Sequence, residues 1–336
     1  MTNIPISNLN PDADSLGLGL DSGGTQTRWA LAHIRGTIIA EGVVGAMSGL
    51  MMSSAGGRAQ VKAVLSDLAF ALRGHARPSH VYAGMTGFDE DGRVIAALVG
   101  DALNISAAQV TISNDIEIAY HDCFAPGEGY VVYAGTGSVS AFIDAAGRLH
   151  RAGGRGALLD DAGGGYWIAR EALRHIWRAE DEMPGTWRAS PMATAVFEKI
   201  GGSDWATTRD FVYGGHFGDS SSSNGSDNRG NIGRLAIAVA AAAGQDPAAL
   251  KILRAAGVEL ARLATAMSSQ FGPRPIALTG RAFELHPEIT LALQTTLADA
   301  VENTKSQPVS ITAKASRPHI AAARIAASLP THQFSK

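Results

Sequence analysis

The sequence predicts an α/β protein with two similar lobes, and three observations lead to this prediction. The chain has 336 residues, whereas single hydrophobic cores usually stop growing at roughly 250 to 300 residues. Short apolar strand patterns alternate with helical periodicities along the chain. A strand, a glycine-rich turn and a second strand occur in residues 16–33 and again in residues 129–144. Such an internal echo is typical of a repeated architectural unit.

The N-terminal half predicts the first of these units. Residues 1–15 are polar and predict a disordered tail. Residues 16–20 alternate leucine with glycine and predict a strand that ends in a glycine-rich turn at 21–27, here called turn 1. Strands are predicted at 28–33, 36–41, 80–83 and 110–113, and helical periodicity at 61–72 and 94–98.

The C-terminal half repeats the opening pattern and then adds helices. Strands at 129–134 and 139–144 flank a second glycine turn at 135–138, here called turn 2, and residues 145–148 predict a hairpin turn. A glycine-rich stretch at 153–165 leads into a helix with one apolar face. Residues 218–231 predict a flexible loop. Two alanine-rich helices (235–243 and 247–269), a strand (275–278) and a closing helix (318–328) complete the chain.

The bulk composition excludes several classes of function. The net charge is −3 with acids and bases intermixed, so no basic stripe predicts binding to nucleic acid or to a membrane surface. The single cysteine, Cys123, cannot form an internal disulfide, a zinc cage or an iron–sulfur cluster. The N-terminus lacks a signal peptide, and no apolar stretch reaches the roughly 20 residues of a membrane span. These features predict a cytoplasmic protein.

The two glycine turns are the strongest chemical signal. Turn 1 lacks the Gly-Lys-Ser/Thr of a Walker loop, and a strand rather than a helix follows it. Either turn alone is compatible with an ordinary glycine hairpin. Together, two such turns facing each other across a cleft would hold the phosphates of one nucleotide between their backbone amides. Asp21, at the end of its strand, is placed to hold Mg²⁺ directly or through water.

Three further aspartates are candidate site residues. Asp115 follows a strand and Asn114, and its carboxylate could accept a proton from a substrate hydroxyl as that hydroxyl attacks the γ-phosphate of ATP. The alternative is a turn-forming Asn-Asp pair. Asp160 and Asp161 precede a glycine run and a helix, so they either cap that helix or accept hydrogen bonds from sugar hydroxyls.

Four motifs in order resemble one family. They are the run 18–27, the run 134–138, Gly153-Gly154-x-Gly156, and the run 159–163 (LDDAG). Their order and spacing are similar to those of the BadF/BadG/BcrA/BcrD-type ATPases, which include N-acetylglucosamine and glucosamine kinases. The resemblance covers about residues 16–325. It implies an actin-like ATPase fold of two ribonuclease H-like lobes with a central cleft, the first lobe formed by 16–115 with 315–336 and the second by 116–314.

The resemblance also implies roles for individual residues. Asp115 would be the general base of an ATP-dependent sugar kinase, and Asp21 would bind Mg²⁺. The nucleotide would contact Asp21, Gly23, Gly24, Thr25 and Thr27 of turn 1, Gly135, Thr136, Gly137 and Ser138 of turn 2, and Thr279 and Gly280 at the adenosine. The sugar would contact Thr86, Gly87, Asn114, Gly154 and Asp161. A homodimer is implied by the resemblance alone.

The chain departs from the family pattern at several positions. Ser22 replaces a glycine, Asp160 stands where glycine is usual, Ala162 where glutamate is usual, and Arg281 where a small residue is common. The run 45–49 (GAMSG) lacks the Asn-His-type pair of N-acetylglucosamine binders. These departures leave the sugar, the hydroxyl that is phosphorylated and the retention of kinase activity open.

Two other functions remain alternatives. A dehydratase activator couples ATP hydrolysis to electron transfer through an iron–sulfur cluster between subunits. One cysteine per chain supplies two ligands per dimer, short of the four required. An actin-like chaperone or sensor would bind nucleotide without a small-molecule acceptor, but such proteins usually carry an additional domain.

Overall fold

The chain forms two compact units. The computed structural model describes residues 15–88, 92–214, 227–304 and 309–330, without the side chains of 227, 303 and 304. Unit 1 comprises Met1–Ala125 and Ser316–Lys336, and unit 2 comprises Pro126–Ala315. The sequence placed the boundary at residue 115, whereas in the structure residues 115–123 form a helix that packs within unit 1.

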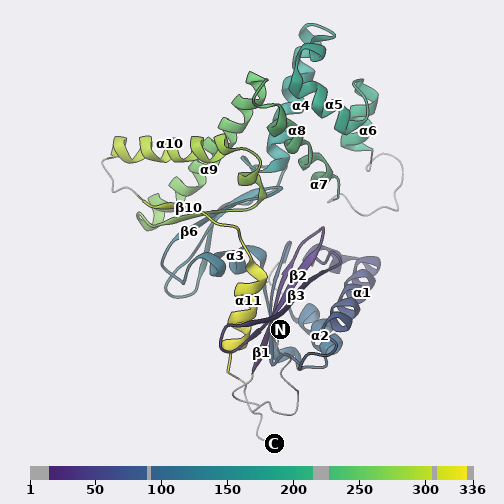
Figure 1. Ribbon diagram of the computed structural model, residues 1–336, viewed down its shortest axis with the longest axis vertical. Coiled ribbons are helices and arrows are strands. Elements are labelled where there is room, and N and C mark those ends of the chain that lie inside the picture. Colours follow the sequence, from purple (N-terminus) through teal and green to yellow (C-terminus); the bar gives the residue numbers. More distant parts are fainter. Residues whose placement is uncertain (1–14, 89–91, 215–226, 305–308, 331–336) are drawn as a thin grey trace, which may run out of the picture. The chain divides into compact units, whose positions relative to one another are not determined.

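Unit 1 is built on a five-stranded sheet of order β3-β2-β1-β4-β5. The strands are β1 (Leu16–Ser22), β2 (Thr27–His33), β3 (Ile38–Val44), β4 (His80–Met85) and β5 (Val110–Asn114). The first three form an antiparallel meander, and β4 and β5 continue the sheet parallel to β1. Helices α1 (Ala55–Ala71) and α2 (Arg93–Leu103) lie on one side of this sheet, and α11 (Pro318–Ser328) lies on the other (Figure 1).

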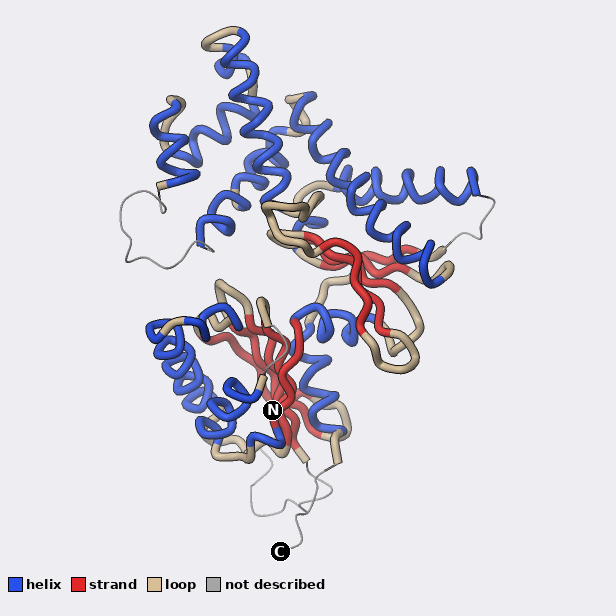
Figure 2. Tube along the Cα trace, turned by 180° about the vertical axis from the view of Figure 1, so that it is seen from behind, coloured by secondary structure: helices blue, strands red, loops and turns tan. Residues whose placement is uncertain are grey.

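The alternation of leucine and glycine in β1 explains how both faces of the sheet are covered. Leu16, Leu18 and Leu20 join the apolar core that includes α1 and α2. A Cβ on Gly17 or Gly19 would collide with the backbone of α11. Because successive residues of a strand point to opposite faces, the glycines let the alanine-rich helix α11 pack directly against β1, as the red strands between blue helices show in Figure 2.

Unit 2 repeats the same sheet topology. Its strands are β6 (Tyr130–Ala134), β7 (Ser138–Ile143), β8 (Leu149–Gly153), β9 (Ile276–Thr279) and β10 (Ile311–Ala313), in the order β10-β9-β6-β7-β8. β6, β7 and β8 form an antiparallel meander, and β9 and β10 run parallel to β6. The internal echo in the sequence therefore corresponds to two sheets of equivalent connectivity.

The helices of unit 2 fall into two groups. α9 (Pro247–Phe271) packs on β6, β7 and β8, and α10 (Pro287–Thr304) packs on α9. The helices of the second group pack mainly against one another, with α4 in contact with several of them. It comprises α4 (Gly165–Glu182), α5 (Pro191–Ile200), α6 (Trp205–Tyr213), α7 (Asp227–Gly233) and α8 (Leu235–Ala242). Short 3₁₀ turns occur at Gly49–Ser53, Ala107–Gln109, Thr186–Ala189 and Arg281–Glu284.

Several sequence-based expectations need correction. Ser15 belongs to the fold rather than to a tail, because it is buried and its carbonyl accepts a hydrogen bond from Ile34 N at 3.0 Å; residues 1–14 lie outside the described residues. β3 begins at Ile38 because Gly36, at φ 83°, forms the preceding turn. Residues 227–231 of the expected loop form part of α7, and residues 218–226 lie outside the described residues.

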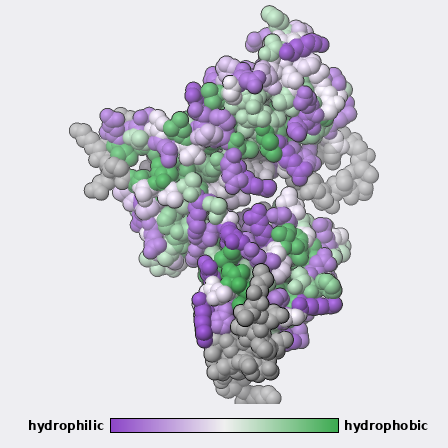
Figure 3. All heavy atoms as spheres, in the orientation of Figure 1, coloured by the Kyte–Doolittle hydropathy of each residue, from purple (hydrophilic) through white to green (hydrophobic). Residues whose placement is uncertain are grey.

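No single helix among the described residues is both long and apolar enough to cross a membrane. Asn228–Ala242 and Pro247–Phe271 pass the criterion of length and composition only as a pair bent by 118°. On the face drawn in Figure 3, apolar residues lie in small groups among polar ones. Leu158 and Leu159 are 98% and 82% exposed.

Candidate active site

Turn 1 connects β1 to β2 at one edge of unit 1. Its chain reversal is closed by a hydrogen bond from Gly23 N to Gln26 O at 3.1 Å. Gly24 and Thr25 are exposed at the tip, where they can meet a ligand. Thr27 is fully buried, and its Oγ1, like Ser22 Oγ, has no hydrogen-bond partner among the described residues. The side chain of Thr27 therefore packs beneath turn 1, and the exposed hydroxyl is that of Thr25.

Asp115 lies at the start of helix α3 (Asp115–Cys123), directly after β5. Asn114 caps this helix, since its side chain accepts a hydrogen bond from Ile116 N at 3.1 Å. The Asn-Asp pair thus begins a helix rather than forming the turn considered as the alternative, and the helix N-terminus stabilises the negative charge of Asp115. Thr86 Oγ1 donates a hydrogen bond to Asp115 Oδ2 at 2.6 Å, which fixes the orientation of the carboxylate.

Asp21 and Asp115 form an electrostatically coupled pair. The pKa of Asp21 is raised to about 6, mainly by burial and next by the negative charge of Asp115, while the positive charge of Arg28 acts in the opposite direction. The coupling arises from the strand order β1-β4-β5. Asp21 lies near the end of β1, and Asp115 directly follows β5, on the other side of β4. Two carboxylates that repel each other in a partly desolvated place favour a bound cation or a shared proton.

The run 45–49 ties turn 1 to Thr86. Met47 N donates to Gly23 O at 3.2 Å, and Gly49 N donates to Thr86 O at 3.0 Å. Thr86 N in turn donates to Ser22 O at 2.9 Å. Met47 is fully buried, so this run is anchored from inside the fold. Turn 1, the run 45–49 and the Thr86-Gly87 turn consequently form one hydrogen-bonded assembly beside Asp115.

Turn 2 connects β6 to β7 in unit 2 and is held by the glycine run before α4. Gly165 N donates to Gly135 O at 2.8 Å, and Tyr166 N donates to Thr136 O at 2.9 Å. A Cβ on Gly164 would lie only 2.7 Å from Gly137 Cα, so this close approach requires glycine. Thr136 is exposed at the tip. The backbone of turn 2 is therefore rigidly supported from behind.

Asp161 is buried beside turn 2 rather than exposed to solvent. It is 3% exposed, and its backbone is left-handed with φ 57°. Asp161 Oδ1 accepts a hydrogen bond from Gly156 N at 3.1 Å, and Oδ2 accepts one from Arg229 Nη2. The neighbouring Asp160 instead accepts from Ala162 N at 3.3 Å and pairs with Arg262 at 3.0 Å.

Three other expected site residues of unit 2 lie close to turn 2. Gly154 N donates to Ser138 O at 3.0 Å, and Ser138 Oγ donates to Ala162 O at 2.6 Å. Gly280 has φ 99°, and a Cβ on it would lie 2.7 Å from Ala134 C. Thr279 is buried, and its Oγ1 has no hydrogen-bond partner among the described residues. The expected phosphate, sugar and adenosine residues of this unit therefore border one turn.

Arg229 is the residue that sequence reasoning missed. It contacts Asp161 and lies against Gly137 of turn 2. The composition of residues 218–231 predicts a flexible loop, and no local pattern links Arg229 to an aspartate so far away in the chain. The one sequence feature that marks Arg229 is that it is an arginine within a polar, glycine-rich run.

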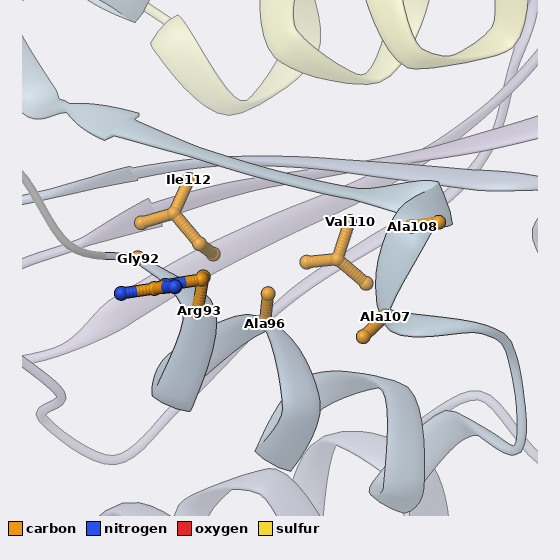
Figure 4. Close-up of a pocket in the computed structure, with 7 residues that line it drawn as sticks. All are labelled: Gly92, Arg93, Ala96, Ala107, Ala108, Val110 and Ile112. Carbon is orange, nitrogen blue, oxygen red and sulfur yellow. The ribbon is translucent and has the colours of Figure 1, made fainter.

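The described residues contain no group of three or more His, Cys, Asp or Glu side chains that could hold a metal ion. A hollow of unit 1 lies elsewhere, between α2 and β5, and Figure 4 shows its lining. Small and apolar side chains form it together with Arg93. Asp21 and Asp115 do not line it, so it is separate from the coupled carboxylates.

Comparison with known proteins places these features in context. The sequence profile of the BadF/BadG/BcrA/BcrD ATPase family matches residues 18–316. An N-acetylmuramic acid/N-acetylglucosamine kinase of Clostridium acetobutylicum is 27% identical over 172 residues, which are 49% of this chain and 54% of that protein. An N-acetyl-D-glucosamine kinase of Dictyostelium discoideum is 33% identical over 108 residues, 30% of this chain and 32% of that protein. The matches thus span about half or less of these relatives.

Solved structures share the fold over nearly the whole chain. A candidate N-acetylglucosamine kinase of Chromobacterium violaceum has a TM-score of 0.66 at 24% identity, covering 94% of this chain and 99% of that one. A ROK family glucokinase of Streptomyces griseus, in complex with glucose and AMPPNP, has a TM-score of 0.59 at 16% identity, covering 93% and 99%. The fold is therefore the two-lobed actin-like fold that the sequence predicted.

Proposed function

The chain belongs to the BadF/BadG/BcrA/BcrD ATPase family, and from this premise we propose that it is an ATP-dependent kinase of a small sugar, N-acetylglucosamine or a related amino sugar. The observation that carries the proposal is the hydrogen bond from Thr86 to Asp115, whose charge is coupled to that of the half-buried Asp21. It supplies an oriented carboxylate at a helix N-terminus, next to a second carboxylate suited to a cation. The relatives named as N-acetylglucosamine kinases support the choice of sugar.

Asp115 is the proposed general base. Its Oδ2 accepts a hydrogen bond from Thr86, which orients the carboxylate that would accept the proton of the sugar hydroxyl as that oxygen attacks the γ-phosphorus. The P–O bond to ADP breaks as the new bond forms, and the proton moves to Asp115. Gly87, the amide of Asn114 and Gly154 are the further proposed sugar contacts, and the family resemblance implies the same contact for Asp161.

Each unit carries its own proposed nucleotide contacts. In unit 1 they are Asp21, Gly23, Gly24, Thr25 and Thr27, the last through its backbone because its side chain is buried. In unit 2 they are Gly135, Thr136, Gly137 and Ser138 at the phosphates, with Thr279 and Gly280 at the adenosine. Backbone amides of the two turns would stabilise negative charge on the transferred phosphoryl group.

The residues present fit Mg²⁺. Burial and the charge of Asp115 make the ionised form of Asp21 unfavourable when no cation is bound, and carboxylate oxygens are the ligands that Mg²⁺ prefers. Asp21 would hold the ion directly or through water. When bound, Mg²⁺ offsets the negative charge of the ATP phosphates. We also propose a cytoplasmic homodimer, on the family resemblance for the dimer and on the sequence for the compartment.

Release of ADP in the presence of a panel of hexoses, hexosamines and N-acetylated hexosamines tests the proposal. A kinase releases ADP in step with sugar phosphate, and only with its own sugar. Asp115→Asn should lower the turnover by roughly 10²- to 10⁴-fold without lowering the melting temperature. Turnover that is independent of every sugar would contradict the proposal and favour a dehydratase activator or a non-kinase actin-like ATPase. A near-wild-type rate in Asp115→Asn would exclude Asp115 as the base.

A further inference from the structure

Arg229 brings a positive charge to turn 2. Its guanidinium lies so close to Gly137 that a Cβ there would collide with Nη2, and the same Cβ would lie 2.8 Å from Asp161 Cγ. The side chain of Arg229 is 37% exposed, so part of its surface is open to solvent. Its Nε is buried and has no hydrogen-bond partner among the described residues.

Asp161 holds this guanidinium in place. The carboxylate is 4% exposed and anchored by Gly156 N through Oδ1, while Oδ2 takes Arg229 Nη2. Removing one partner from a buried ion pair leaves a charge without compensation, which is strongly unfavourable. The pair therefore fixes the position of a cation next to a turn whose backbone amides are suited to an anion.

We propose that Arg229 is a phosphate-binding residue of turn 2 and that Asp161 is its positioning residue. The inference rests on the proposed use of ATP by this site. The planar fork of a guanidinium presents five donors, so one edge can pair with Asp161 while another contacts a phosphate oxygen. Charge-assisted hydrogen bonds of this kind are roughly twice as strong as neutral ones. Turn 2 then binds phosphate with a fixed cation as well as with amides.

This inference differs from the role implied by family resemblance, in which Asp161 contacts the sugar. A sugar-binding aspartate presents free acceptor oxygens to hydroxyl groups. In the structure each oxygen of Asp161 already accepts one hydrogen bond, from Gly156 or from Arg229, and the carboxylate is almost fully buried. A positioning role predicts that replacing Asp161 lowers the affinity for nucleotide, whereas a sugar-binding role predicts that it lowers the affinity for sugar. Measuring the two affinities therefore separates the roles.

Nucleotide affinity in the absence of sugar tests the inference directly. Calorimetric titration of ATP, ADP and AMP into the full-length protein should show that Arg229→Met weakens ATP and ADP binding by roughly 10- to 150-fold, with AMP affected least. Arg229→Lys keeps the charge but loses the fork, so it should recover part of the affinity. Arg234→Met, an exposed arginine close by in the sequence, is the matched control and should bind all three nucleotides as the wild type does.

Asp161→Asn separates positioning from direct contact. It should weaken ATP binding without sugar present, and the double variant with Arg229→Met should be no weaker than Arg229→Met alone, because the two residues act as one unit. Equal weakening of all three nucleotides by both the Met and the Lys variants, together with a lower melting temperature, would assign Arg229 to folding and overturn the inference. Unchanged ATP affinity with a raised KM for sugar in Asp161→Asn would overturn it as well.

These outcomes are distinguishable from failure of the proposed kinase activity. Wild-type protein that binds ATP but phosphorylates no sugar would contradict the proposed function, while the Arg229 comparison would still stand. If the wild type binds ATP and Arg229→Met binds it with the same affinity, the Arg229 inference alone would be overturned. Wild-type protein that binds no nucleotide would overturn both.

Discussion

Replacing Asp21 by Asn should stabilise the ligand-free protein, and the size of the effect should depend on pH. The pKa of Asp21 rises from 3.8 to about 6 in the folded chain, with burial as the main cause and the charge of Asp115 second. A raised pKa means that the folded state binds the proton more tightly than the unfolded state. Stability from this group is therefore full at low pH and declines as pH rises toward about 6.

The magnitude follows from the shift itself. A difference of about 2 pKa units corresponds to about 3 kcal/mol, which is the loss reached well above pH 6. At about pH 4.5 the same linkage gives a loss of only about 1 kcal/mol, because the folded carboxyl is still protonated. Asp21→Asn has no carboxylate to ionise, so its advantage over the wild type should grow by about 2 kcal/mol between about pH 4.5 and about pH 8.

Hydrogen exchange of peptides from β1 and β4 reports the opening free energy of unit 1 by itself. The wild type and Asp21→Asn are compared at both pH values without divalent cations or nucleotide. Adding Mg²⁺ with ATP should narrow the gap at about pH 8, because a cation stabilises the ionised form of Asp21. An advantage of the variant that is constant with pH, or that shrinks as pH rises, would refute the reasoning.

Three further substitutions test local geometry. Thr86→Val removes the hydrogen bond that orients Asp115; it should lower kcat roughly tenfold with little change in melting temperature, and an unchanged kcat would remove Thr86 from the site. Gly164→Ala forces a methyl group against the backbone of turn 2, so ATP affinity should fall roughly tenfold in the same calorimetric titration, and retained affinity would show that turn 2 yields freely. Gly17→Ala should lower the free energy of unfolding by about 3 kcal/mol or more, because the methyl group meets the backbone of α11. The control Gly56→Ala, in an open position of α1, should raise that free energy by about 0.5 to 1 kcal/mol, and equal denaturant midpoints for the two variants would contradict the packing argument.

The sequence by itself determined the strand–turn–strand units and most of the helices around them. Because successive residues of a strand point to opposite faces, the alternation of leucine with glycine gives β1 one face with large apolar side chains and one face without side chains. The glycine-rich runs between strand patterns predict both turns, since glycine is typical of tight chain reversals. The repeat of the pattern encodes two sheets of the same connectivity. All of these features depend on residues close together in the chain.

Only the tertiary structure decided which distant side chains meet and which are buried. The raised pKa of Asp21 depends first on its burial in the folded chain and second on β5 bringing Asp115 toward it. The burial of Thr27 and the pairing of Arg229 with Asp161 depend on the packing of strands and helices from different parts of the chain. Desolvation and charge pairing are set by distances in space, and the order of residues in a polypeptide does not specify those distances until the chain has folded.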